Sequence, residues 1–400
     1  MSSSRLPLEG IRVLDVGTLI AGPFAATLLG DFGAEVIKVE QPGPGDTHRS
    51  LGPAVDGQRL DWAVTARNKR SITLDLRQLE GQELLLRLAA VSDVLVENFR
   101  PGTLEGWNLG PERLEAANPR LVVCRVSGFG QTGPHARKPG FDRIGLAFGG
   151  LMYLTGHPDR PPVRSTIPIG DYICATYAAL GVLLALYERD GRGSGRGQSI
   201  DVAMYETIFR LTESLVATYE LTGAVPERLG NRNVRAAPTG VFATRDGRYV
   251  AVAIVGEPLW QRFTQALAGA PLADDPRFAT NADRMANVDT LEALVAEWIG
   301  ARDYAEVARV CDEHAVPLSL IYSAADIVTD PHYAARESIV EVSWAGKTLR
   351  MPTVVPRLGR TPGRIDHAGP TLGEHNEPVY GELLGLTAAD LEALRANRVI

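Results

Sequence analysis

Short β-rich runs alternate with helical segments through the first third of the chain, and this alternation is the feature that most restricts the fold. The strand-like runs lie at 11–16, 35–40, 71–76, 94–99 and 121–126, and helical patterns lie at 22–29 and 81–90. Each repeat takes about 25 to 30 residues, the spacing at which a helix returns the chain to a parallel strand. The sequence therefore predicts an α/β fold with a doubly wound parallel sheet, which binds ligands at the carboxyl ends of its strands.

The pattern changes after a turn rich in glycine and arginine at 191–197. A long helical pattern follows at 202–221, and an Arg-Asp-Gly turn then joins two β-rich runs between 242 and 254, as in a hairpin. Further helices are predicted at 258–267, 288–299, 304–313 and 388–397. We therefore expect a large α/β domain at 1–200 and 350–400, a linker helix at 201–225, a small α+β domain at 226–330 and a return linker at 331–349.

Charge and cysteine content exclude several classes of protein. The formal net charge of −7 argues against nucleic acid or an anionic membrane as the partner. The cysteines, Cys124, Cys174 and Cys311, are far apart, which predicts neither a disulfide framework nor a zinc site. The apolar run at 173–187 is shorter than a bilayer span and predicts a buried helix. The N-terminus shows no signal segment, so we expect a cytoplasmic protein.

Common cofactor motifs do not account for the chain. Gly17, Gly22, Gly30 and Gly33 follow the first strand without the spacing of a dinucleotide fingerprint. No P-loop, metal-binding histidine pair or serine nucleophile elbow occurs. Asp201, beside the glycine-rich turn, is interpreted as a helix N-cap rather than as an acid or base.

Several longer motifs do identify a family. They include Leu8-Glu-Gly-Ile-Arg-Val-Leu-Asp-Val, Ala21-Gly-Pro-Phe, Leu29-Gly-Asp-Phe-Gly-Ala-Glu-Val-Ile-Lys-Val-Glu, Gly45-Asp46, Asn68-Lys-Arg-Ser-Ile, Val96-Glu-Asn-Phe-Arg-Pro-Gly, Gly128-Phe-Gly-Gln-Thr-Gly-Pro, Gly140-Phe-Asp, Ile169-Gly-Asp171 and Leu372-Gly-Glu-His. In this order they closely resemble the family III coenzyme A (CoA) transferases, also called the CaiB/BaiF type, and cover nearly the whole chain. Related α-methylacyl-CoA racemases share the scaffold.

The resemblance implies a Rossmann-like large domain that holds both termini, a smaller domain, and two chains interlocked as a homodimer. It also implies that CoA moves from an acyl-CoA, such as succinyl-CoA or another dicarboxylyl-CoA, to a carboxylic acid through a covalent intermediate on Asp171. CoA and its acyl ester are then substrates, and neither a permanent cofactor nor a metal is expected.

Asp171 allows two interpretations that are compatible with each other. It follows Pro168-Ile-Gly and precedes an apolar helical run, so it could be an N-cap worth about 1 kcal/mol. The helix dipole there should keep the carboxylate ionised, as a nucleophile requires. With the family motif around it, we expect Asp171 to be the catalytic residue.

The resemblance assigns supporting residues around Asp171. Backbone N–H groups near Ile20, Ala21 and Gly22 would bind the acyl oxyanion. Phe141 would form an apolar wall, and Asp142 would lie near the nucleophile or act only as a cap or partner of Arg143. The residues assigned to CoA binding are Ile20, Lys69, Leu74, Asn98, Arg100 and Lys138. Arg67 and Arg70 could either contact a phosphate or lie on a solvated surface. Gln41 and Gly106 stand where relatives often carry a cation, so two phosphate contacts of the family are missing here.

Two questions of specificity remain open at this point. A racemase would need a histidine where this chain has Phe141, which cannot exchange a proton, so the racemase is the less favoured alternative. Arg228, Arg232 and Arg235 could anchor the distal carboxylate of a dicarboxylic acid or form a salt-bridge network. The loop at 255–260 lacks the glycine-rich run of formyl-CoA transferase, which argues against formate or oxalate as substrates.

Overall fold

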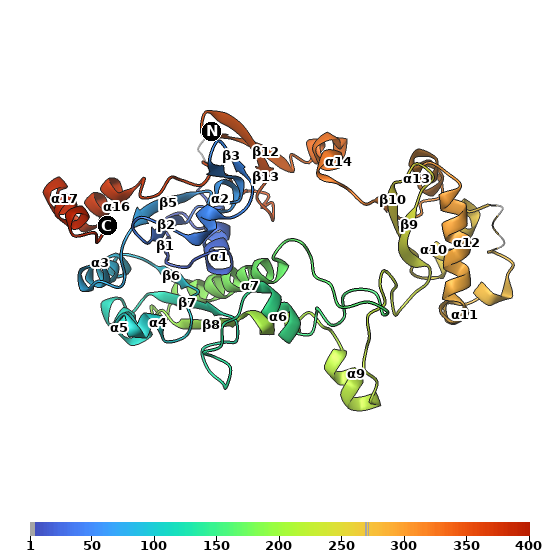
Figure 1. Ribbon diagram of the computed structural model, residues 1–400, viewed down its shortest axis with the longest axis horizontal. Helices are drawn as coiled ribbons and strands as arrows, with labels where there is room; N and C mark the ends of the chain where they lie inside the picture. The colour runs from blue at the N-terminus through green and yellow to red at the C-terminus, as the bar shows by residue number, and fades with distance from the viewer. Residues whose placement is uncertain (1–4, 269, 271) are drawn as a thin grey trace. The chain divides into compact units, whose positions relative to one another are not determined.

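The computed structural model describes residues 5–268, 270 and 272–400, and these residues form two compact units. Unit 1 comprises 1–151, 165–214 and 335–400, and unit 2 comprises 152–164 and 215–334. The chain leaves unit 1 after residue 151 and again after residue 214, and each time it returns, so unit 2 consists of two segments inserted into unit 1 (Figure 1).

A six-stranded parallel sheet forms the centre of unit 1. Its strand order is β5-β2-β1-β6-β7-β8, and every neighbouring pair is parallel. The strands are β1 (Arg12–Asp15), β2 (Glu35–Glu40), β5 (Lys69–Thr73), β6 (Val94–Glu97), β7 (Val122–Ser127) and β8 (Ser199–Ala203). The order reverses between β1 and β6, and such a reversal opens a crevice at the carboxyl ends of the two strands. The predicted α/β class with a parallel sheet is confirmed.

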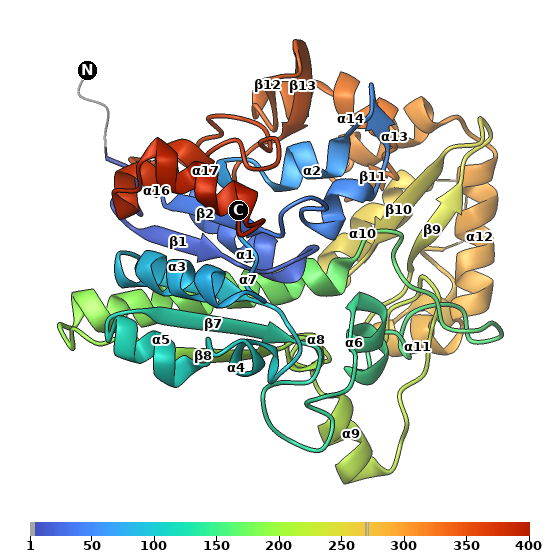
Figure 2. The same ribbon diagram turned by 60° about the vertical axis from the view of Figure 1, so that its left-hand side comes forward.

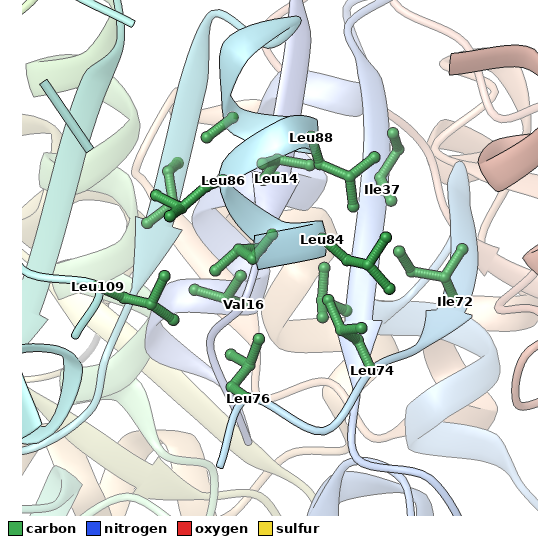
Figure 3. Packing of buried hydrophobic residues seen from close by; sticks show 14 of the residues in the cluster. Leu14, Val16, Ile37, Ile72, Leu74, Leu76, Leu84, Leu86, Leu88 and Leu109 are labelled. Atoms are coloured by element: carbon green, nitrogen blue, oxygen red, sulfur yellow. The ribbon is translucent and has the colours of Figure 1, made fainter. Parts of the chain in front are cut away.

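Helices cover both faces of this sheet because alternate strand residues point to opposite sides. Val13 packs in the core shared with α1 (Ala21–Gly30) and α7 (Ile169–Leu186), whereas Leu14 packs in the core beneath α3 (Leu79–Ala90). Figure 3 shows the α3 leucines lying against Leu14, Ile37 and Ile72 of the sheet. The C-terminal helices α16 (Asn376–Leu384) and α17 (Ala388–Ala396) complete this face (Figure 2).

Smaller elements complete unit 1. They are a 3₁₀ turn (Thr47–Ser50), β3 (Ala54–Val55), β4 (Gln58–Arg59), α2 (Leu60–Thr65), α4 (Thr103–Gly106), α5 (Pro111–Ala117), α6 (Asp142–Phe148), α8 (Met204–Phe209), and the hairpin of β12 (Ile339–Trp344) and β13 (Lys347–Pro352). The hairpin packs on α2, since Val342 and Met351 share a core with Ala63. The segment expected as a return linker therefore contains part of a folded hairpin.

The continuous helix predicted at 202–221 is wrong. Its first residues belong to β8, which pairs with β7, and they are followed by the short helix α8 and then by α9 (Leu215–Thr222) in unit 2. Asp201 lies in β8 and is no N-cap; its Oδ2 accepts the N–H of Gln131 at 2.9 Å. Pairing with the neighbouring strand, which local pattern does not reveal, decides the conformation here.

Unit 2 is an α+β unit with its own hydrophobic core. Its antiparallel sheet has the order β11-β10-β9, formed by β9 (Thr239–Ala243), β10 (Tyr249–Ala253) and β11 (Leu318–Leu320), and the predicted hairpin is confirmed. The helices are α9, α10 (Glu257–Ala266), α11 (Asn281–Ala286), α12 (Val288–Gly300), α13 (Tyr304–Glu313) and α14 (Ala324–Thr329); α15 (Pro331–Ala335) and the 3₁₀ turn Pro276–Phe278 are shorter.

Helix α7 and its π-helical extension to Gly191 are long and apolar enough to cross a membrane, by length and composition alone. The predicted short run at 173–187 is therefore only part of a longer helix. Helix α7 packs against α1 and the sheet through small buried residues such as Cys174, Ala175 and Ala178, as a core helix does.

Candidate active site

Asp171 is the third residue of α7 and is no N-cap. The helix begins at Ile169 after Pro168, whose side chain makes no capping hydrogen bond. In the part of the chain that the structure describes, the Asp171 carboxylate has no hydrogen-bond partner. The predicted capping role is wrong, because the helix starts three residues earlier than the apolar run indicated.

The charge state of Asp171 also differs from the expectation. Burial, followed by the nearby charge of Asp142, raises the pKa of Asp171 to about 7. Both causes favour the neutral acid. The helix dipole therefore does not keep this carboxylate strongly acidic, and near neutral pH the ionised and protonated forms coexist.

Asp142 connects the first turns of two helices. It is the first residue of α6, is 8% exposed, and accepts the Gly170 N–H on Oδ1 at 2.8 Å. A Cβ at Gly170 would lie 2.9 Å from that same oxygen, so only glycine fits here. The preceding Phe141 is 60% exposed within unit 1, so its ring does not form a buried wall beside Asp171 in this unit.

The first turn of α1 lies beside the first turn of α7. Phe24 and Tyr172, one residue beyond Asp171, make an edge-to-face contact with ring centroids 4.8 Å apart. Among the described residues, the N–H groups of Ile20, Ala21 and Gly22 have no acceptor, and no side chain caps α1. Unpaired N–H groups at a helix start favour negative charge nearby, as the predicted oxyanion role requires.

The turn between β1 and α1 is held from two sides. Asn98, which follows β6, accepts the Thr18 N–H at 2.7 Å and donates to the Thr18 carbonyl at 2.8 Å. Asp46 accepts the Leu19 N–H on Oδ1 at 2.9 Å. Leu19 has a φ of 63°, a left-handed conformation that costs a residue with a Cβ about 1–2 kcal/mol. These hydrogen bonds offset that strain.

The side chain of Asn98 is bound to the turn between β1 and α1. Both polar atoms of its side chain are used by Thr18. Glycines enclose it: a Cβ at Gly17 would lie 3.0 Å from its Oδ1, and a Cβ at Gly22 would lie 3.3 Å from its Cβ. Its contact with the nucleotide stays a prediction, since the side chain is half-buried and its polar groups already bond to the Thr18 backbone.

A cavity of about 170 Å³ opens at the carboxyl ends of β1, β2, β5 and β6. Predicted Leu74 lines it, together with Gly17, Thr18, Lys38, Glu40, Gln41, Asp46, Arg77, Phe99 and Trp107. Phe99 and Trp107 meet edge to face at 5.1 Å, which gives the cavity an aromatic side. It lies where the strand order reverses, the usual ligand position in such sheets.

Lys69 lies in the core instead of at a binding surface. It is 1% exposed, and its Nζ bonds to Asp15 Oδ2 at 2.8 Å and to the Pro23 carbonyl at 2.6 Å. Burial lowers its pKa, against the opposing charge of Asp15. Its predicted contact with a CoA phosphate is wrong, because the ammonium is enclosed and already paired.

The neighbouring arginines are structural as well. Arg67 makes a two-pronged pair with Asp31, and Arg70 bridges Glu35 and Glu382. By contrast, Arg100 and Lys138 are exposed, and neither has a hydrogen-bond or ion-pair partner among the described residues. These two cations remain available for phosphate.

Sequence reasoning gave no role to Lys38 and Asp46, although both lie in the recognised motifs. Lys38 is buried in β2, 3.0 Å from Asp46 Oδ2 and 3.6 Å from Asp15 Oδ1. The sequence feature that could have revealed this ion pair is the position of Lys38 between Ile37 and Val39, in a strand buried on both faces. Such a position tolerates a charge only when the charge is paired.

Two of the arginines proposed for substrate choice have partners within unit 2. Arg232 binds Asp289 and Glu292, and Arg228 donates to the Tyr153 carbonyl at 2.9 Å and lies over the Tyr153 ring. These contacts favour the salt-bridge interpretation for Arg232, whose charge is already neutralised.

Comparison with known proteins agrees with these features. The model of the CoA-transferase family III matches residues 8–376. The chain is 48% identical over 404 residues to a succinyl-CoA–D-citramalate CoA-transferase of Chloroflexus aurantiacus, covering 100% of both chains. It is 43% identical over 401 residues to a succinyl-CoA–L-malate CoA-transferase alpha subunit of Chloroflexus aurantiacus, covering 99% of this chain and 93% of that one.

A solved structure is similar as well. A CaiB/BaiF family protein from Brucella suis superposes with a TM-score of 0.85 at 34% identity, covering 95% of this chain and 100% of the other. Sequence motifs, the fold and these relatives agree, and the chain therefore belongs to the family III CoA transferases.

Proposed function

We propose that this CoA transferase moves CoA from succinyl-CoA to a short dicarboxylic acid, such as citramalate or malate, through a covalent intermediate on Asp171. The relatives named for these substrates support the choice of donor and acceptor. The observation that carries the mechanism is an Asp171 carboxylate without a hydrogen-bond partner among the described residues, beside the uncapped start of α1.

In the first half-reaction the Asp171 carboxylate attacks the thioester carbonyl. The C–S bond breaks, and CoA leaves as a thiolate while the acyl group forms a mixed anhydride with Asp171. The thiolate then attacks the aspartyl carbonyl and releases the donor acid, which leaves an aspartyl-CoA thioester. The acceptor carboxylate reverses these two steps and departs as its CoA ester. One thioester replaces another, so no further energy source is needed.

The surroundings of Asp171 suit this chemistry. The raised pKa makes the ionised form a more basic carboxylate, and nucleophilicity rises with basicity. The absence of hydrogen-bond donors to it, among the described residues, leaves its lone pairs available. The uncapped N–H groups of α1 would stabilise the oxyanion that forms on the thioester carbonyl.

CoA would occupy the cavity at the carboxyl ends of the strands. Phe99 and Trp107 offer apolar surface for the adenine, above the buried Leu74. Arg100 and Lys138, exposed and without a partner among the described residues, offer cations for the phosphates. The racemase alternative is not favoured, because Phe141 cannot act as a base and the relatives are named as CoA transferases.

The proposed assembly is a homodimer in the cytoplasm. No residue of α9 is buried although the helix is mainly apolar, and α7 with its π-helical extension exposes Leu184 and Tyr187. Such surfaces are typical of interfaces. The three cysteines are unpaired thiols, as expected in a reducing compartment.

The test combines trapping with a matched variant. Wild-type protein treated with succinyl-CoA and hydroxylamine should carry a hydroxamate on Asp171, located by mass spectrometry. Asp171→Asn should lose transfer by at least about 1000-fold, because an amide cannot form the anhydride. Asp201→Asn, which replaces an exposed acid in β8, is the control and should keep its activity.

Each result bears on a different part of the proposal. Transfer by Asp171→Asn above about 1% of the wild-type rate would remove Asp171 from the nucleophile role. Assays with succinate, malate, citramalate, mesaconate, glutarate and oxalate as acceptors would identify the acid. Equal rates for oxalate and for the longer acids would contradict the proposed substrate class.

A further inference from the structure

The β1–α1 turn, defined as Thr18, Leu19 and Ile20, has an energetically unfavourable conformation that is maintained by groups outside it. Leu19 has a φ of 63° and is a leucine, which has none of the freedom of glycine. The chain would leave this conformation unless other contacts fixed it, and such strain concentrates at functional sites.

Asn98 and Asp46 supply those contacts from two different segments. Asn98 holds both the N–H and the carbonyl of Thr18, and Asp46 holds the N–H of Leu19. Asp46 is itself fixed by Lys38, 3.0 Å away, and is 3% exposed. Every N–H of the turn before Ile20 is therefore paired, and the next three, from Ile20 to Gly22, have no acceptor among the described residues.

The β1–α1 turn also has two functional neighbours. Thr18 and Asp46 line the cavity at the strand ends, while the helix that begins after Ile20 lies beside the start of α7 and Asp171. A change in the turn would redirect the unpaired N–H groups without removing any group that touches CoA.

We propose that Asn98 and Asp46 are positioning residues, which hold Leu19 in its left-handed conformation so that the N–H groups of Ile20 to Gly22 face the reacting acyl group. This proposal rests on the function proposed above. It assigns Asn98 to the chemical step and not to nucleotide binding.

The proposal predicts a separation of kcat from KM. Asn98→Ala should lower kcat by about 100-fold or more, the order found when an oxyanion donor is lost, and should change the KM for succinyl-CoA by less than about threefold. An Asn98 that binds the nucleotide would give the opposite result, a raised KM with kcat retained, and this would overturn the proposal.

Rescue by glycine provides the sharper test. Glycine adopts a positive φ without the steric cost of a Cβ, so Leu19→Gly in the Asn98→Ala background should restore kcat by about fivefold or more. Leu19→Ala in the same background keeps the Cβ and should not restore it. Equal effects of glycine and alanine would overturn the role of the left-handed conformation.

Asn118→Ala is the matched control. Asn118 is half-buried like Asn98 and also binds backbone groups, donating to Ala89 and Ser92 and accepting from Arg120. It lies after α5, at the amino-terminal end of β7. We expect its loss to affect thermal stability and to leave kcat unchanged. A fall in kcat as large as in Asn98→Ala would show a merely structural effect.

Amide hydrogen exchange tests the positioning independently of activity. In Asn98→Ala the amides of Thr18 and Leu19 should exchange at least about tenfold faster, and Leu19→Gly should return part of the protection. If the wild-type protein transferred no CoA, the proposed function would fail, yet exchange would still decide whether Asn98 holds the turn. Unchanged exchange in Asn98→Ala would overturn the inference while leaving the transferase proposal intact.

Discussion

At the scale of single residues, the proposed role of Asp171 as the nucleophile makes its environment the control on how the reaction depends on pH. Burial and the charge of Asp142 raise the pKa of Asp171 to about 7. A carboxylate nucleophile acts only when it is ionised, so activity should rise with pH through this value. The usual aspartate pKa, near 4, would give no such dependence in the neutral range.

The first prediction therefore concerns the pH at which kcat/KM begins to fall on the acid side. For the wild-type protein, kcat/KM should fall about tenfold per pH unit below about pH 7. Asp142→Asn removes one of the two causes of the raised Asp171 pKa and keeps an oxygen that can accept the Gly170 N–H. The inflection of the pH profile should therefore move to lower pH. An inflection near pH 4 in both proteins would contradict the influence of burial and of Asp142.

At the scale of elements, buried ion pairs join the central strands. Lys69 at the start of β5 and Lys38 in β2 both reach Asp15 at the end of β1, and each is about as enclosed as the core leucines. Removing one member of such a pair leaves a charge buried and unpaired, which costs about 3–5 kcal/mol. Their role is to hold the strand ends beneath the cavity.

The second prediction contrasts Lys69 with Arg100. Lys69→Met should lower the free energy of unfolding by about 3–5 kcal/mol, measured by urea denaturation. Arg100→Ala should leave stability within about 0.5 kcal/mol, because an exposed side chain without a partner among the described residues is removed, and should raise the KM for succinyl-CoA. A stable Lys69→Met protein with a raised KM would reinstate Lys69 as a phosphate contact.

At the scale of the whole molecule, each unit has its own core, yet apolar surface remains uncovered on both. In α9, Val216, Tyr219 and Leu221 are 49%, 54% and 85% exposed. An eight-residue helix without buried side chains has little reason to be stable alone in water. A second copy of the chain would cover it.

The third prediction concerns this helix. Light scattering should give the wild-type protein twice the mass of its 43.1 kDa chain. Tyr219→Glu with Leu221→Glu should shift the mass toward the monomer, because charges are costly in a buried interface. Thr222→Glu, on the same helix, is the control for added charge. A monomeric wild-type protein would contradict the homodimer.

The sequence by itself determined the chain order and type of five of the six strands in the sheet of unit 1, and it missed β8. Alternating β and α patterns, with glycine and proline between them, predicted β1, β2, β6 and β7 to within two residues or so, because these strands are buried on both faces and are therefore rich in apolar β-branched residues and leucine. The family motifs also singled out Asp171 as the candidate nucleophile, a role that stays a prediction.

Tertiary structure alone decided what the charged residues do. The partner of Lys69 is Asp15, which lies 54 positions away in the sequence, and the partner of Asn98 is Thr18, at a separation of 80 positions. No local pattern therefore distinguishes a buried pair from a phosphate contact. The pKa of Asp171 depends on burial and on Asp142, which arrives on another helix. Burial and distance set the energy of a charge, and both exist only once the chain has folded.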